Sequence, residues 1–154
     1  MTANQHMNAA PTSAAFFVSG LPAPQGSKRH VGGGVLVESS KKVKPWRQAV
    51  AAAASAEGIR ITGPVHVFLG FWFVRPQSHY RTGRNAHMLR EDAPLRPTSR
   101  AHGDLDKLAR STLDGLVAGG LISDDDYVVD LLAQKHYGAE PGAQVQVVSL
   151  GVAL

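Results

Sequence analysis

The strongest constraint on the fold is the run of residues 65–74, which is rich in β-branched and aromatic side chains. This composition favours a β-strand, and Arg75-Pro76 ends it. Residues 77–103 then show no apolar period and carry five arginines: Arg81, Arg84, Arg90, Arg96 and Arg100. A stretch this long without a period is typical of a functional or mobile loop.

Two helices are predicted from their end signals and periods. Residues 46–56 are Ala-rich, with Pro45 suited to an opening turn and Gly58 to a C-terminal stop. The second helix begins after Asp104 or Asp106, either of which can cap it, and ends at Gly119-Gly120. Residues at helical spacing form its inner face: Leu105, Leu108, Thr112, Leu113 and Leu116.

Shorter strand patterns complete the chain, at residues 16–20, 35–38, 127–137 and 144–152. The order strand, strand, helix, strand, basic loop, helix, strand, strand predicts one small α+β domain with a mixed β-sheet and two main helices. We expect this domain over residues 16–154 and a flexible N-terminal tail over residues 1–15.

The composition excludes several classes of site. The 154 residues include no cysteine, so disulfides, thiolate zinc sites, iron–sulfur clusters and cysteine nucleophiles are ruled out. No apolar run approaches the ~20 residues that span a bilayer, and the N-terminus lacks a signal pattern. We therefore expect a cytoplasmic protein with no membrane partner. Gly32-Gly33-Gly34 lacks the lysine and helix of a P-loop, so no nucleotide cofactor is expected.

Charge is distributed unevenly along the chain. Thirteen Lys and Arg but only four acids precede Asp104, a net charge of +9. From Asp104 onward, three basic residues face eight acids, a net charge of −5, which together give the formal +4. A basic surface that collects phosphates would explain the first part, and a site for divalent cations the second.

The acidic residues form two runs, Asp104-Leu105-Asp106 before the second helix and Asp124-Asp125-Asp126 after it. The helix between them is ~20 Å long at 1.5 Å per residue, so the connecting loop must fold back if the runs are to meet. Clustered carboxylates without His or Cys fit Mg²⁺ or Mn²⁺ and do not fit zinc. Spacing alone leaves a second interpretation open, in which these aspartates are helix caps and a solvated acidic loop.

The order and spacing of several motifs resemble the RusA family of small Holliday-junction resolvases, common in bacteriophages and prophages. The matching residues are 103–110, 113–116 and 124–130, followed by Lys135. Nearer the N-terminus, Gly20-x-Pro22-x-Pro24 followed by Lys28-Arg29, and Lys42-x-x-x-Trp46-Arg47, are similar to the phage branch. Residues 77–103 have no counterpart in the resemblance.

The resemblance implies a homodimeric, Mg²⁺-dependent endodeoxyribonuclease that nicks opposing strands of a four-way DNA junction during recombination and repair. Its metal ligands fall on Asp104, Asp106 and Asp125, with Asp124 as a neighbouring acid and Mn²⁺ as a substitute ion. We expect Asp125 to come from the same subunit as the other two. The metal would activate a water for in-line attack on the phosphorus.

The family's catalytic lysine falls on Arg110, which is a departure, because arginine stays charged but is a poor proton donor. Lys107 lies on the same helix face and could share the role, and Lys135 matches a basic position of the next strand. The remaining candidates for DNA contact come from the two basic stretches: Lys28, Arg29, Lys41, Lys42, Lys44, Arg47, Arg81 and Arg84.

Two alternative functions stay open beside the resolvase. One is a non-catalytic DNA-binding protein with a structural metal site, which the departure at Arg110 allows. The other is a nuclease for different branched DNA, which would use the same site. For the dimer interface, the helix beginning at Trp46 and the strand containing Phe71 are the candidates.

Overall fold

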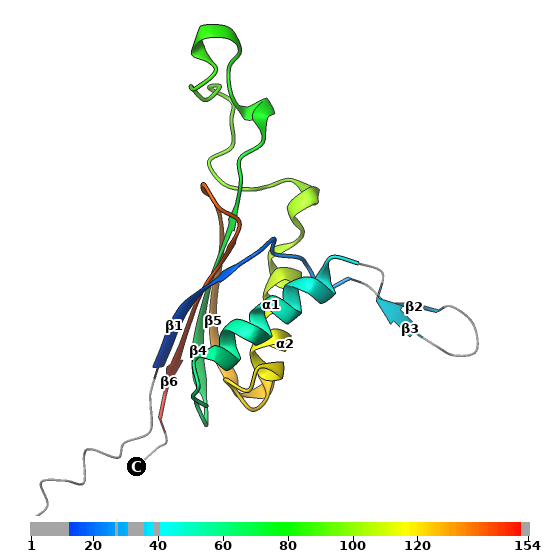
Figure 1. Ribbon diagram of the computed structural model, residues 1–154, viewed down its shortest axis with the longest axis vertical. Coiled ribbons are helices and arrows are strands. Elements are labelled where there is room, and N and C mark those ends of the chain that lie inside the picture. The colour runs from blue at the N-terminus through cyan, green and yellow to red at the C-terminus, as the bar shows by residue number, and fades with distance from the viewer. Residues whose placement is uncertain (1–12, 27, 31–35, 39–40, 152–154) are drawn as a thin grey trace, which may run out of the picture.

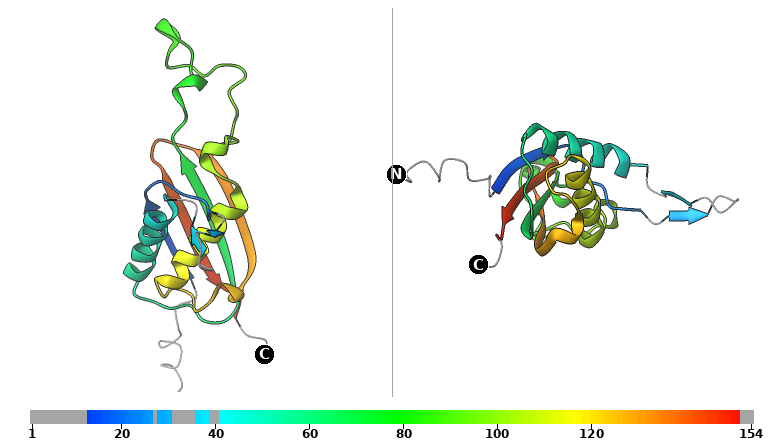
Figure 2. Two further views of the ribbon diagram at one scale, coloured as in Figure 1. Left: turned by 90° about the vertical axis from the view of Figure 1, so that its right-hand side faces the viewer. Right: turned by 90° about the horizontal axis from the view of Figure 1, so that it is seen from below.

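The computed structural model describes residues 13–26, 28–30, 36–38 and 41–151. Four strands form a mixed sheet in the order β1-β6-β4-β5. Both helices cover one face of this sheet (Figures 1 and 2). The strands of this sheet are β1 (Ser13–Ser19), β4 (Val65–Phe73), β5 (Val128–Tyr137) and β6 (Gly142–Ser149). The described part of the chain is thus a small α+β domain with two main helices, as predicted.

The central strand β4 pairs antiparallel with β6 and parallel with β5. Its odd-numbered residues, from Val65 to Phe73, are buried, because they face the helices. This explains the strength of the strand pattern in the sequence. The even-numbered residues lie on the opposite face, where Trp72 stacks on His136 of β5 with ring centroids 4.6 Å apart. Phe17, Leu132 and Val148 are exposed large apolar side chains in strands of this sheet.

The helices α1 (Val43–Ala56) and α2 (Leu105–Ala118) pack closely against each other. Close approach depends on Gly115, where an added Cβ would lie 2.7 Å from Val50. One buried hydrogen bond also joins them, from the indole Nε1 of Trp46 to Thr112 Oγ1 at 3.0 Å. Because an unpaired indole N–H is costly in a core, this bond fixes how the helices meet.

Residues 74–99, called the arm below, project beyond the end of the sheet between β4 and α2 (Figure 1). The sequence predicts a functional or mobile loop here, and the structure shows a loop with internal hydrogen bonds. Backbone hydrogen bonds join Arg81 N to Met88 O at 2.8 Å and Arg90 N to His79 O at 2.9 Å. The guanidinium Nε atoms of Arg81 and Arg90 donate to the carbonyls of Leu89 and Tyr80. The arm is therefore braced by its own arginines.

A further hairpin of β2 (Lys28–His30) and β3 (Leu36–Glu38) extends from the body and forms a separate two-stranded sheet (Figure 2). The strand pattern of the sequence predicts β3 and does not predict β2. The arm connects through 3₁₀ turns at η2 (Gln77–His79) and η3 (Gly83–Asn85) and returns through η4 (Arg100–His102). A last turn, η5 (Asp125–Tyr127), precedes β5.

Several predicted boundaries differ from the observed ones. Residues 13–15 belong to β1, where they pair with β6, so the predicted tail is too long at its inner end; residues 1–12 lie outside the described part. Gly32-Gly33-Gly34 also lies outside it. In the two elements expected at a dimer interface, the side chains of Trp46 and Phe71 are themselves buried in the core, whereas α1 also has exposed residues such as Lys44 and Gln48. Among the described residues, no helix is long and apolar enough to cross a membrane.

Candidate metal centre and nucleic-acid interface

Asp104 lies at the start of α2, where it is the N-cap residue and its side chain is 71% exposed. The turn before it depends on Gly103, whose φ of +86° is one that L side chains rarely adopt. Lys135 of β5 donates from Nζ to Gly103 O at 3.2 Å. Asp104 makes no side-chain capping bond, and its carboxylate is 3.9 Å from Lys107 Nζ. The carboxylate is thus positioned by its surroundings yet open to a ligand.

The second acidic run forms the turn η5. Asp124 Oδ1 accepts a hydrogen bond from the backbone N of Asp126 at 3.2 Å, and the carboxylates of Asp124, Asp125 and Asp126 lie within 4.8 Å of one another. Hydrogen bonding between Asp124 and Asp125 lowers the pKa of Asp124 and raises that of Asp125. Three exposed carboxylates this close repel one another, so a cation among them would relieve the repulsion.

The structure brings parts of the predicted ligand set together. Asp106, Arg110 and Asp125 line one hollow of about 260 Å³ between α2 and β5. Neither Asp104 nor Asp106 joins the close group of η5. The acid outside η5 that raises the pKa of Asp125 is Asp114, on the C-terminal half of α2. Asp104 therefore precedes α2 and does not line this hollow, whereas Asp125 lines it together with Asp106 and Arg110.

The donor set fits a hard divalent cation. The aspartates of both acidic runs offer carboxylate oxygens as ligands. Mg²⁺ sites in proteins typically use one or two carboxylates together with waters and substrate phosphate. Asp104, Asp106 and Asp125 are all exposed, so none of these carboxylates is shielded from an ion in solution. Cysteine is absent from the chain, and the described residues place no histidine in the acidic group, which excludes the usual zinc donors.

The predicted basic residues have different surroundings. Arg110 is exposed beside Asp106, whereas Lys41, Lys42 and Lys44 are exposed at the start of α1. Arg47 lies 3.9 Å from Asp114, which places part of this basic stretch against α2. For Lys28 and Arg29 the structure describes the backbone in β2, and their side chains lie outside the description.

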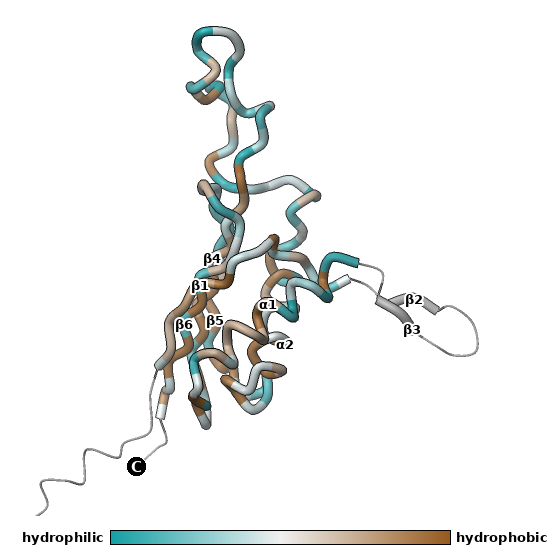
Figure 3. The backbone as a smooth tube through the Cα atoms, viewed as in Figure 1, coloured by the Kyte–Doolittle hydropathy of each residue, from teal (hydrophilic) through white to brown (hydrophobic). Residues whose placement is uncertain are grey.

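Arg81 and Arg84 both belong to the arm but differ in role. Arg81 braces Leu89, as described above, whereas Arg84 is exposed and makes no hydrogen bond or ion pair with the residues that the structure describes. The arm is predominantly hydrophilic (Figure 3). Arg84 is therefore the better placed of the two for contact with a nucleic acid.

A cluster of rings that the sequence does not predict lies at the base of the arm. His102 packs on Phe73 with centroids 4.4 Å apart, and Tyr137 contacts both His79 and His102 edge-on. Arg75 lies over the Tyr137 ring at 4.3 Å and donates to Pro94 O at 2.7 Å. Burial and the charge of Lys135 lower the pKa of His102. No spacing pattern in the sequence predicts this cluster, because its residues come from four separate segments of the chain.

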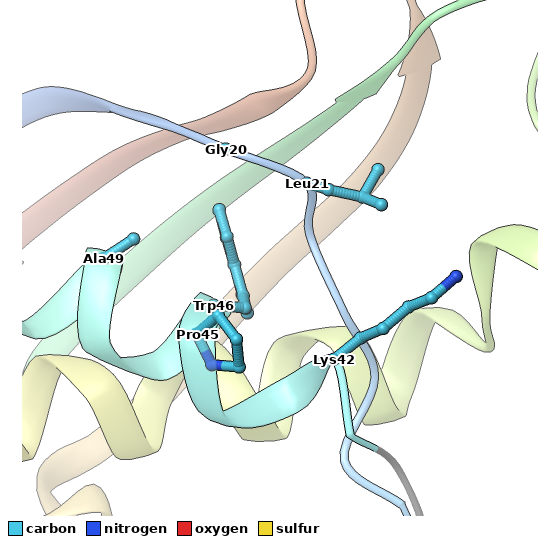
Figure 4. Close-up of a pocket in the computed structure, with 6 residues that line it drawn as sticks. All are labelled: Gly20, Leu21, Lys42, Pro45, Trp46 and Ala49. Carbon is cyan, nitrogen blue, oxygen red and sulfur yellow. The ribbon is translucent and has the colours of Figure 1, made fainter.

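An apolar hollow of about 260 Å³ lies at the start of α1, where Leu21, Pro45 and Trp46 meet (Figure 4). Among the described residues that line it, Lys42 is the charged one, and none carries a carboxylate. This hollow is thus separate from the acidic residues, and the candidate centre is the region around α2 and η5.

An α+β fold with an all-carboxylate candidate centre beside basic surface elements defines a class of small, nuclease-like proteins. The model of the endodeoxyribonuclease RusA family matches residues 19–148, and the chain belongs to this family. The matched range includes every predicted site residue, from Lys28 to Lys135. A comparison with curated proteins finds no match.

Proposed function

We propose that this protein is a Mg²⁺-dependent endonuclease that resolves four-way DNA junctions by paired phosphodiester hydrolysis. Membership of the RusA family supports the nuclease activity. The observation that carries the assignment to particular residues is the hollow where Asp106 and Asp125 face Arg110. Carboxylates for a cation and a fixed positive charge for a phosphate are the two components that such hydrolysis requires.

Asp104, Asp106 and Asp125 would hold the metal, with Asp124 adjacent. When bound, Mg²⁺ supplies an activated water and offsets charge on the leaving oxygen. Arg110 pairs with the phosphate and stabilises the negative charge that develops on it. Because a guanidinium stays protonated, Arg110 does not donate a proton. Lys107 is the better candidate for donating one.

We also infer that the protein acts as a homodimer. Within one chain, Asp106 and Asp125 already line one hollow, whereas Asp104 lies at the start of α2 and does not line it. Two equivalent centres related by a two-fold axis also suit a four-way junction, which presents two equivalent strands. The shared hollow supports the expectation that Asp125 comes from the same subunit as Asp106.

The test is a nicking assay on a synthetic four-way junction, with linear duplex alongside and with Mg²⁺ or EDTA. Asp104→Asn and Asp125→Asn should bind the junction and lose cutting by at least about 100-fold, because each removes a charged ligand. Glu140→Gln, in the exposed β5–β6 turn, is the matched control and should cut normally. Cutting by both Asn variants at the unaltered rate would contradict the site.

Mixing the two inactive variants tests the dimer. If one centre takes Asp104 and Asp125 from different copies, mixed dimers regain one intact centre and nick one strand. If both acids come from the same copy, each mixed dimer has two damaged centres and no nicking returns.

A non-catalytic DNA-binding protein is the second candidate. The observation in its favour is Arg110 at the position of the family's lysine, together with a carboxylate group in η5 that can hold a structural ion by itself. In that case the junction is bound without being cut in Mg²⁺ or Mn²⁺. Cutting of flaps as readily as four-way junctions would instead indicate a nuclease for branched DNA in general.

A further inference from the structure

A polar cleft of about 470 Å³ opens directly beside Asp104. Three segments form its walls: the loop Pro24–Gly26, the turn η4 with Arg100, and the first turn of α2 with Lys107. Two cationic side chains and one carboxylate therefore line this concave site, so positive charge predominates here, whereas negative charge predominates in η5.

The wall formed by residues 24–26 is fixed to the helix. Gln25 N donates to Lys107 O at 3.0 Å, and the buried Ser111 Oγ donates to Ala23 O at 2.6 Å. Pro24 packs against Gly103 so closely that a Cβ there would lie 2.6 Å from its Cγ. The cleft is thus preformed, and its shape does not depend on a ligand.

Arg100 is held at the cleft by the turn that precedes α2. Ser99 caps this turn by accepting a hydrogen bond from Ala101 N at 3.1 Å. Unlike Arg75, Arg81 and Arg90, which donate to carbonyls of the arm, the Arg100 side chain makes no hydrogen bond or ion pair with the described residues. Its five donors are available to a ligand in the cleft.

We propose that this cleft binds a backbone phosphate that neighbours the scissile one on the same DNA strand, through Arg100 and Lys107. A guanidinium matches the two free oxygens of a phosphodiester, and the described residues that line the cleft include no aromatic side chain on which a base could stack. The proposal rests on the nuclease function above and adds a positioning residue, Arg100, which sets the register of the strand over Asp104.

The experiment replaces single phosphates by neutral methylphosphonates, one position at a time, on both sides of the expected cut near the junction centre. Binding is measured in EDTA, so that no cutting occurs. For the unaltered protein, one neighbouring methylphosphonate should weaken binding about tenfold, as expected for the loss of a charge-assisted hydrogen bond. Arg100→Gln should weaken binding of unmodified DNA by a similar factor and should then be insensitive to that one substitution.

Arg60→Gln is the matched control, because Arg60 is exposed and contacts Gly120 at the far end of α2. It should keep the full methylphosphonate effect. Arg100→Lys should show intermediate affinity, because a lysine restores the charge without the bidentate geometry. The inference is overturned if the loss of affinity caused by Arg100→Gln and the loss caused by the methylphosphonate are additive at every position.

Failure of the cleft proposal can be distinguished from failure of the nuclease proposal, because the binding measurements do not require cutting. If the junction is cut but the binding losses from Arg100→Gln and from the methylphosphonates are additive, only the role of the cleft is contradicted. If the junction is never cut, but the binding losses are non-additive at one methylphosphonate position, the cleft remains a phosphate site and the nuclease proposal is contradicted.

Discussion

At the scale of single residues, His136 shows how the sheet's uncovered face responds to pH. It stacks on Trp72, and its Nε2 lies 3.1 Å from Gln134 Oε1. Burial, and then the positive charge of Arg96, lower its pKa from the usual 6.5. The folded state therefore favours the neutral imidazole.

The fold should consequently lose stability on acidification. The contribution of His136 is complete above the unfolded pKa of 6.5 and is lost as the pH falls from there towards the lower folded value. Thermal unfolding midpoints between pH 8 and pH 5 should decline less for His136→Gln than for the unaltered chain. Parallel declines would show that this histidine is not involved.

Gly103 is a second single residue with a large expected effect. Gly103→Ala adds a Cβ that collides with Pro24 and also strains a backbone of positive φ, so it should cost about 2–4 kcal/mol of unfolding free energy. Gly83→Ala is the control, because Gly83 has a φ of +67° with no atom within 4 Å of an added Cβ. It should cost only about 1 kcal/mol. Urea unfolding of both variants measures the difference, and equal losses would contradict the role of Pro24.

Residue types at fixed spacing made part of the site predictable. Leu108 and Leu116 gave α2 its inner face, and the helix then placed Asp104 before it and Asp125 after it. The fit of Lys135 against Gly103 was not predictable, because it depends on β5 returning beside α2. Nor was the order of the arm, since it comes from Arg81 and Arg90 donating to carbonyls, and such bonds leave no period in the sequence.

At the scale of elements, the packing of α1 against α2 connects the helix layer that covers the sheet with the acidic residues around α2. Val50 fits over Gly115, and Thr112 both accepts from Trp46 and donates to Leu108 O at 2.8 Å. Because α2 carries Asp104 and Asp106 at its start, a loosened helix pair would also loosen the carboxylates.

Thr112→Val tests this contact. Valine has a similar shape but no oxygen, so the buried indole N–H of Trp46 loses its partner at a cost of about 1–3 kcal/mol. Thr112→Ser keeps the oxygen and should lose only about 1 kcal/mol for the missing methyl group. Chemical denaturation followed by Trp fluorescence measures both. A valine variant as stable as the serine variant would show that the hydrogen bond contributes nothing.

At the scale of the whole molecule, the arm and the start of α1 carry the positive charge, whereas the acids are gathered around α2 and η5. DNA affinity should therefore fall steeply with salt, because bound phosphates release counterions. The acids themselves repel DNA, and a bound divalent cation would reverse that local repulsion.

The salt dependence of binding can be resolved to one residue. Arg84→Ala should reduce the slope of log K against log salt concentration by about one unit without changing thermal stability, because this side chain braces nothing in the arm. Arg60→Ala, at the opposite end of the molecule, should leave the slope unchanged. Fluorescence anisotropy with a labelled junction across a series of salt concentrations gives both slopes, and identical slopes would exclude the arm tip from the interface.

The parallel pairing of β4 with β5 has a consequence for how the molecule assembles. These strands are neighbours in the sheet, yet residues 74–127 lie between them in the chain and carry the arm, α2 and both acidic runs. Pairing across so wide a separation requires closing a long loop before any contact repays the lost entropy, which makes it slow. A newly made chain can thus gain much of its helix early, while its carboxylates take their places only when this central pair closes.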